Sequence, residues 1–123
     1  CRCYSSLGQL KYLSAIKHCD IVIGNSSSGI IEAPSFKKPT INIGDRQENR
    51  IKADSVIDCE PRKEEIYNAI IKSQTKDFMK KLSKMNSPYG NGNSSEKIMK
   101  IIKSIDYSNK ESILKKPFYD LNT

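Results

Sequence analysis

The residues best suited to chemistry lie between Asp20 and Pro34, in the run DIVIGNSSSGIIEAP. The first part of this run is apolar and typical of a strand, and the second part is a turn of small residues that opens a helix. The first turn of a helix has unpaired backbone N–H groups and the positive end of the helix dipole, and small residues let an anion approach both. Three consecutive serines add hydroxyl donors. The run therefore predicts a phosphate-binding site.

Short apolar strands alternate with helices around this run. The apolar spacing and the positions of Gly and Pro predict helices over residues 7–19, 29–36 and 63–73, and strands over residues 21–23, 40–43 and 56–59. Continuous apolar strands between helices are typical of a parallel sheet that is buried on both faces. The sequence therefore predicts an α/β fold of the doubly wound class, in which ligands bind at the carboxyl ends of the strands.

The first of these helices has apolar residues at Leu10, Leu13, Ala15 and Ile16, which predicts one buried face. After residue 73, the pattern predicts a short helix over residues 75–84, a loop over residues 86–93 and a helix that ends near residue 105. The tail from residue 106 has no clear period. We therefore expect a domain over residues 1–105 and a C-terminal tail over residues 106–123.

Length and composition restrict the class of protein. The chain has 123 residues and 37% apolar residues, which suffices for one domain with a core but not for two. No apolar stretch approaches the roughly 20 residues that span a bilayer, and the N-terminus has no signal-peptide pattern, so we expect a cytoplasmic protein with no membrane partner. The chain begins at Cys1 and reaches patterned sequence within a few residues, as expected of a fragment of a longer protein.

The charge of the chain is strongly basic, with a net charge of +7. Four lysines lie four residues apart on the predicted helices and are most simply a solvated face: Lys72, Lys76, Lys80 and Lys84. A basic surface also suits nucleic acid, but the sequence lacks interleaved aromatic residues and a helix-turn-helix pattern. We therefore expect no nucleic-acid partner.

The four cysteines have neither the spacing of a zinc site nor that of a secreted disulfide framework. Cys19 and Cys59 adjoin apolar runs, where a thiol behaves as a small hydrophobic side chain. A metal at Cys1 and Cys3 is the alternative, and we expect reduced thiols and no metal. His18, the only histidine, lies at the end of the first predicted helix, where the helix dipole favours it.

Three segments occur together and in order: Gly24 to Pro34 (GNSSSGIIEAP), Pro39 to Gln47 (PTINIGDRQ) and Ser87 to Asn93 (SPYGNGN). With them the chain resembles UDP-N-acetylglucosamine 2-epimerase, and specifically the C-terminal half of the hydrolysing bacterial enzymes that make N-acetylmannosamine for sialic acid. The resemblance runs from about Ser6 to the end. It implies two Rossmann-like domains in a glycosyltransferase B-type architecture, of which this chain would be the C-terminal, UDP-binding one, lacking its own N-terminal part and the whole partner domain.

The resemblance also implies roles for particular residues. Ser26 and Ser27 would contact the diphosphate, and Gly29 would let the start of the helix lie close to it. Glu32 would accept hydrogen bonds from the ribose hydroxyls, as the acidic residue of dinucleotide-binding folds does. The alternative for Glu32 is a carboxylate that stabilises the helix dipole. Arg46 would clamp the diphosphate or the substrate.

The resemblance bears on four further residues. Gln47 belongs to the motif of Arg46 and would bind substrate, and Tyr89 would lie near the UDP in a loop that helps to close the cleft. A purely structural turn is the alternative for that loop. Arg50 is a weaker candidate that could equally pair with Asp45 or Glu48. Asn49 stands where relatives often have glycine, and asparagine tolerates the left-handed conformation that such a loop needs.

The family reaction removes the proton at C2 of the sugar, eliminates UDP and adds water to the unsaturated intermediate, without a cofactor. Its acids and bases come mostly from the other domain, so this chain would bind without turnover. The resemblance also implies a homo-oligomer for the full-length enzyme. Two alternatives stay open, the donor-binding half of a glycosyltransferase and a non-catalytic remnant. UDP or GDP as the nucleotide, and the identity of the amino sugar, also stay open.

Overall fold

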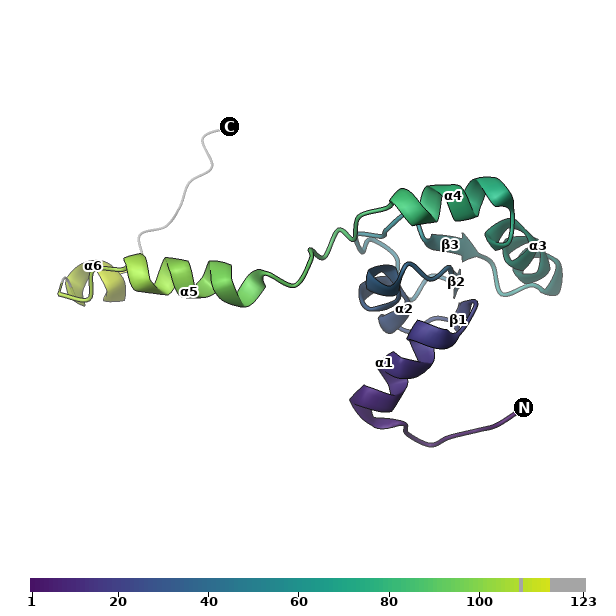
Figure 1. Ribbon diagram of the computed structural model, residues 1–123, viewed down its shortest axis with the longest axis horizontal. Helices are drawn as coiled ribbons and strands as arrows, with labels where there is room; N and C mark the ends of the chain where they lie inside the picture. The colour runs from purple at the N-terminus through teal and green to yellow at the C-terminus, as the bar shows by residue number, and fades with distance from the viewer. Residues whose placement is uncertain (109, 116–123) are drawn as a thin grey trace. The chain divides into compact units, whose positions relative to one another are not determined.

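The computed structural model describes residues 1–108 and 110–115. Its centre is a sheet of three parallel strands, β1 (Val22–Gly24), β2 (Thr40–Ile43) and β3 (Val56–Cys59), in the order β1-β2-β3 (Figure 1). In this register Thr40 of β2 lies between Val22 of β1 and Val56 of β3. The predicted parallel sheet is therefore confirmed, and its carboxyl ends form one edge.

One face of the sheet is covered by α3 (Lys63–Ser73). Ile41 of β2 and Ile57 of β3 form a buried cluster with Ala69 of this helix. Because successive side chains of a strand point to opposite faces, this face also receives Ile43, which packs against the cluster. Burial of these aliphatic side chains anchors α3 to the two strands.

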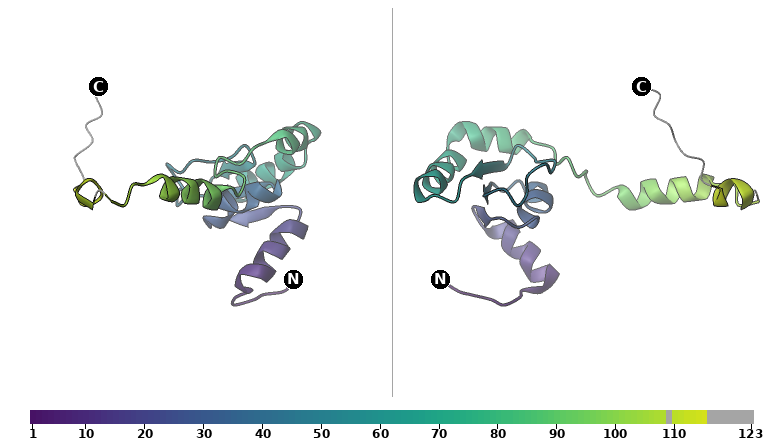
Figure 2. Two further views of the ribbon diagram at one scale, coloured as in Figure 1. Left: turned by 60° about the vertical axis from the view of Figure 1, so that its left-hand side comes forward. Right: turned by 180° about the vertical axis from the view of Figure 1, so that it is seen from behind.

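The opposite face of the sheet is covered by α2 (Ser28–Ile31), which contacts β1 and β2. Thr40 points to this face, where its Oγ1 donates a hydrogen bond to the carbonyl oxygen of Gly29 at 2.8 Å. In Figures 1 and 2, α3 and α4 (Lys76–Lys84) lie on one side of the sheet and α1 (Gly8–His18) and α2 on the other. Helices on both faces confirm the doubly wound class.

The single helix predicted over residues 29–36 is wrong in one respect. The segment forms α2 and then a separate 3₁₀ helix, η1 (Ala33–Phe36). The break falls next to Pro34, because proline has no N–H to continue the α-helical ladder and its ring clashes with the preceding turn. Lys37 then ends η1 in the left-handed conformation, with φ of 52°.

The prediction of a buried face on α1 holds only in part. Ile16 is buried and Leu13 is half-buried, but Ala15 is exposed and Leu10 is 84% exposed. The reason is that α1 packs mainly on η1, a four-residue element that is too short to cover an eleven-residue helix. Ile23 of β1 is likewise 50% exposed, since α3 covers β2 and β3.

A second small core lies beneath α4. Leu82 and Met85 pack with Ala53, and Phe78 contacts both clusters. The Oγ1 of Thr75 caps this helix by accepting a hydrogen bond from the N–H of Phe78 at 3.3 Å. The lysines predicted on a solvated face are exposed: Lys72, Lys76, Lys80 and Lys84.

The contacts divide the chain into two compact units, Cys1–Asn91 and Gly92–Thr123. The second unit contains α5 (Ser94–Ser104), which buries none of its residues, and α6 (Lys110–Leu114). The helix α6 lies in the predicted tail, where the sequence showed no period. Residues 109 and 116–123 of that tail lie outside the described residues. Across the described parts of both units, no helix combines the length and the apolar character needed to cross a bilayer.

Candidate functional site

The serine turn, residues 25–28, connects the carboxyl end of β1 to α2. The Oγ of Ser26 accepts a hydrogen bond from the N–H of Ser28 at 3.3 Å, and its carbonyl oxygen accepts one from the N–H of Gly29 at 3.2 Å. The carbonyl oxygen of Ser27 accepts from the N–H of Ile30. Among the hydrogen bonds of the described residues, none uses the N–H of Ser26 or Ser27 as its donor. Both N–H groups are therefore free for an anion.

The helix that follows the serine turn is short. Because α2 has four residues, it provides a much smaller dipole than the longer helix that the sequence predicts. Gly29 is buried, and a Cβ at this position would lie 2.6 Å from Cγ2 of Thr40. The structure thus gives Gly29 a packing role against β2. The anion-binding capacity of the turn rests on free N–H groups and hydroxyls.

The arginine loop, residues 45–55, connects the carboxyl end of β2 to β3 and contains no helix. Asn49 adopts the left-handed conformation with φ of 60°, which confirms the prediction made for this position. Arg46 and Arg50 are exposed. Within the described residues neither arginine forms an ion pair, so the alternative pairing of Arg50 with Asp45 or Glu48 is not formed.

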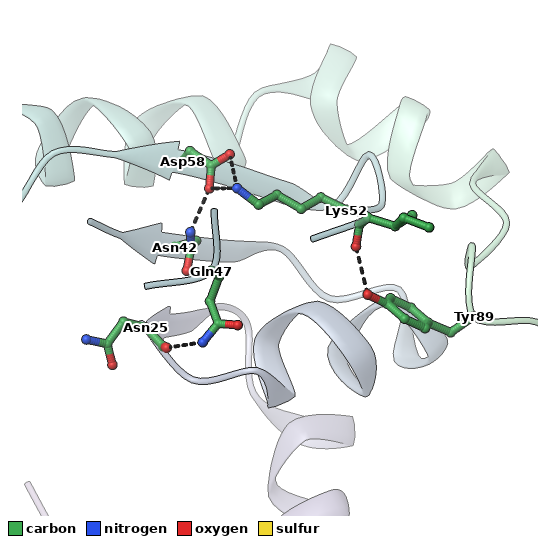
Figure 3. Close-up of polar contacts among 7 residues, drawn as sticks. Asn25, Asn42, Gln47, Lys52, Asp58 and Tyr89 are labelled. Atoms are coloured by element: carbon green, nitrogen blue, oxygen red, sulfur yellow. Dashed lines mark hydrogen bonds and ion pairs between the residues drawn. The ribbon is translucent and has the colours of Figure 1, made fainter. Parts of the chain in front are cut away.

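Three of the polar contacts of the arginine loop are drawn in Figure 3. At its start, Nε2 of Gln47 donates to the carbonyl oxygen of Asn25 in the serine turn at 2.8 Å. Further along, the hydroxyl of Tyr89 donates to the carbonyl oxygen of Ile51 at 2.8 Å. These contacts join the loop to two other segments, the serine turn and the loop of Tyr89, which belong to the first and third motifs.

The third contact is an ion pair with β3. Nζ of Lys52 lies 2.8 Å and 2.9 Å from the two carboxylate oxygens of Asp58. Oδ1 of Asp58 also accepts from Nδ2 of Asn42 at 2.7 Å, and Asn42 is 1% exposed. These residues were not predicted as part of the site, although an aspartate inside the apolar strand Val-Ile-Asp-Cys indicates a paired carboxylate.

Glu32 lines a hollow of about 640 Å³ beside the start of α1. The hollow is lined by Tyr4, Ser6, Leu7, Gly8, Gln9, Tyr12 and Glu32. Oε2 of Glu32 is buried and has no hydrogen-bond partner in the part of the chain that the structure describes. The hydroxyl of Tyr12 donates to Oγ of Ser28 at 2.6 Å, which connects the hollow to the serine turn. Tyr12 was not predicted, because its position on α1 reads as ordinary helix packing.

A second hollow, of about 400 Å³, lies at the carboxyl ends of β2 and β3. Its lining is acidic: Gly44, Asp45, Glu48, Lys52, Asp58, Cys59, Glu60 and Glu65. Burial raises the pKa of the Cys59 thiol, and the negative charges of Glu65, Asp58 and Glu60 raise it further. This part of the edge therefore repels an anion.

The remaining residues considered for a functional role are cysteines and the histidine. Cys59 packs against the first core cluster, and Sγ of the half-buried Cys19 donates to the carbonyl oxygen of Ile16 at 3.3 Å, as expected for structural thiols. His18 lies in the last turn of α1. Among the described residues, no group of histidine, cysteine and acidic side chains is placed to hold a metal ion.

Comparison with known proteins points to one family. The family model described as UDP-N-acetylglucosamine 2-epimerase matches residues 1–103. The chain is 42% identical over 110 residues to the polysialic acid biosynthesis protein P7 of Escherichia coli, which covers 89% of this chain and 28% of that protein. It is also 42% identical over 119 residues to the GDP/UDP-N,N'-diacetylbacillosamine 2-epimerase (hydrolyzing) of Campylobacter jejuni, which covers 96% of this chain and 30% of that enzyme.

A third relative carries the family description in its own name. The chain is 41% identical over 59 residues to the UDP-N-acetylglucosamine 2-epimerase of Neisseria meningitidis, which covers 48% of this chain and 16% of that enzyme. The chain thus spans less than a third of the length of each of these relatives.

Proposed function

The chain belongs to the UDP-N-acetylglucosamine 2-epimerase family, and on that basis we propose that it holds the nucleotide diphosphate of a sugar nucleotide in a hydrolysing 2-epimerase. One observation carries this proposal. The serine turn, with two free N–H groups, and the arginine loop, with two unpaired arginines, are joined by the hydrogen bond from Gln47 to Asn25. Donors from two connections are thereby gathered at one edge of the sheet.

The diphosphate would be bound by groups that stay positive or act as donors. The N–H groups and hydroxyls of Ser26 and Ser27 donate to its oxygens, and the guanidinium of Arg46 pairs with its charge. No carboxylate of the described residues forms an ion pair with Arg46, so its charge is available to the ligand. Gly29 brings α2 against β2 and so sets where the turn lies.

The nucleoside would occupy the hollow beside Glu32. The unpartnered Oε2 of Glu32 is an acceptor that the ribose hydroxyls can satisfy, which removes the cost of leaving a buried carboxylate oxygen unpaired. Tyr4 and Tyr12 offer aromatic side chains to a base in the same hollow. A ribose in this hollow would lie close to a diphosphate at the serine turn, since the hydroxyl of Tyr12 donates a hydrogen bond to Oγ of Ser28.

In the reaction, these residues would stabilise the leaving group. Negative charge accumulates on the diphosphate as the bond to the sugar breaks, and fixed donors at that position lower the barrier. The acid and base that move the C2 proton would come from parts of the longer protein. The isolated chain should therefore release no UDP from UDP-N-acetylglucosamine.

Calorimetric titration of UDP and of GDP into the chain tests the proposal. We expect saturable binding of the preferred nucleotide, and binding at least about tenfold weaker in Glu32→Ala, since a charged hydrogen bond contributes about 1.5–3 kcal/mol. Glu64→Ala, which removes an exposed carboxylate in the first turn of α3, is the matched control. Absence of binding by either nucleotide would overturn the proposal.

A further inference from the structure

Gln47 is a buried side chain in a loop whose neighbouring residues are exposed. Only 3% of Gln47 is accessible, whereas Arg46 and Glu48 on either side are exposed. Glutamine is rarely buried without a partner, because its amide loses hydrogen bonds to water. Here Nε2 donates to the carbonyl oxygen of Asn25 at 2.8 Å. The side chain therefore points to the protein and serves a contact within it.

The hydrogen bond from Gln47 to Asn25 lies directly beside two candidate ligand residues. Gln47 directly follows Arg46, and Asn25 directly precedes Ser26, so one hydrogen bond fixes the start of both loops relative to each other (Figure 3). The contacts with Tyr89, Asp58 and Lys81 hold the arginine loop further along, at Ile51, Lys52 and Asp54. Beside Arg46, the N–H of Glu48 donates to the carbonyl oxygen of Asp45 at 2.7 Å, a bond within the loop itself. Among the side-chain hydrogen bonds of the described residues, the one from Gln47 therefore ties the Arg46 end to the serine turn.

We propose that Gln47 is a positioning residue that holds Arg46 in register with the serine turn, so that both loops meet the same diphosphate. The inference rests on the proposed function and deepens it. The resemblance to the family implies that Gln47 binds substrate. In this proposal it acts instead through Asn25 and Arg46, without touching the ligand.

The variant Gln47→Met tests the hydrogen bond alone. Methionine has a similar length, and the Oε1 that it removes has no hydrogen-bond partner among the described residues, so only the bond to Asn25 is lost. We expect UDP binding about five- to tenfold weaker, as for one lost hydrogen bond, with the thermal midpoint close to that of the wild type. Gln74→Met, the same change at an exposed glutamine beyond α3, is the control and should bind UDP normally.

Amide hydrogen exchange of the free chain separates this inference from the proposed function. In Gln47→Met, we expect faster exchange at the backbone N–H groups of both the serine turn and residues 46–48, with β2 and β3 unchanged. This measurement needs no nucleotide. A wild-type chain that binds neither UDP nor GDP would overturn the proposed function, whereas unchanged exchange in Gln47→Met would overturn the positioning role by itself.

The variant Gln47→Glu supplies a signature that general destabilisation does not give. A carboxylate cannot donate to the carbonyl oxygen of Asn25, but a protonated carboxyl can. UDP affinity relative to the wild type should therefore recover as the pH falls from about 8 to about 5, because burial raises the pKa of a carboxyl. A constant ratio, or a double variant Arg46→Ala/Gln47→Met whose losses simply add, would contradict the proposal.

Discussion

The two connections between the strands are built in different ways. The path from β1 to β2 passes through α2 and η1, and its position is fixed by the buried contact between Gly29 and Thr40. The path from β2 to β3 contains no helix, and polar side chains fix the position of its arginine loop. The position of the serine turn thus depends on close packing against the sheet, and that of the arginine loop depends on polar contacts.

Because the two connections are held differently, substitutions in them should affect the stability of the fold and the affinity for ligand to different extents. Close packing of α2 on the sheet is part of the core, so a change there acts on folding as a whole. Each polar contact of the arginine loop contributes about 0.5–1.5 kcal/mol, so the loop can shift while the sheet stays folded. Substitutions in the first connection should therefore lower stability, and those in the second should mainly alter binding.

The largest effect is expected for Gly29→Ala. The added Cβ would lie 2.6 Å from Cγ2 of Thr40, and relief of such a contact in a packed core costs about 1–3 kcal/mol. Urea denaturation measures this loss. Thr40→Ser removes the clashing Cγ2 and keeps the hydroxyl that bonds to Gly29, so the same alanine should cost much less in that background. Equal costs in both backgrounds would contradict the packing role of Gly29.

The next effect is expected for Asp58→Ala, which removes the partner in β3 of Lys52 in the arginine loop. This change leaves the buried Asn42 and the charge of Lys52 without their partner, and we expect a loss of about 1–2 kcal/mol in the free energy of unfolding. Asp54→Ala removes the more exposed pair with Lys81 and should cost about 0–1 kcal/mol. If the two variants lost the same stability by urea denaturation, the network around Asp58 would have no special role.

The first connection was largely predictable from the sequence. Apolar strands alternate with helices there, and the small residues between Gly24 and Gly29 indicate where the strand gives way to a turn. The exception was the length of α2, where Pro34 ends the helix earlier than the apolar pattern suggests. The prediction followed the apolar periodicity through Pro34, whereas in the structure the proline interrupts the α-helix.

The second connection was predictable in its residues but not in their contacts. The second motif selects Arg46 and Gln47, and the third selects Tyr89, which contacts this connection. No local pattern indicates that Gln47 is buried or that the hydroxyl of Tyr89 donates to the carbonyl oxygen of Ile51. These contacts join residues far apart in the chain, and they depend on how the loop crosses the edge of the sheet. The spacing of residues along the sequence does not predict how a loop crosses the sheet, so it does not predict these contacts.

A smaller effect is expected for Tyr89→Phe. The ring stays, and only the hydrogen bond to the carbonyl oxygen of Ile51 is lost, which should lower stability by about 0.5–1 kcal/mol because the site is exposed to water. Binding of UDP should weaken less than in Gln47→Met, since this contact holds the loop at Ile51 and not beside Arg46. Tyr67→Phe changes an exposed tyrosine of α3 in the same way and should be neutral in both calorimetry and denaturation.

The smallest effect concerns the acidic hollow at the end of β3. Burial and the charges of Glu65, Asp58 and Glu60 raise the pKa of Cys59 above its ordinary value of 9.0, so the unfolded chain loses this proton at a lower pH than the folded one. The resulting stability is complete below that value and falls as the pH rises through it. Unfolding measured at several pH values should show a flatter alkaline decline in Cys59→Ala, and an intermediate one in Glu65→Gln. A decline unchanged by both variants would mean that the acidic lining has no electrostatic consequence for the stability of the fold.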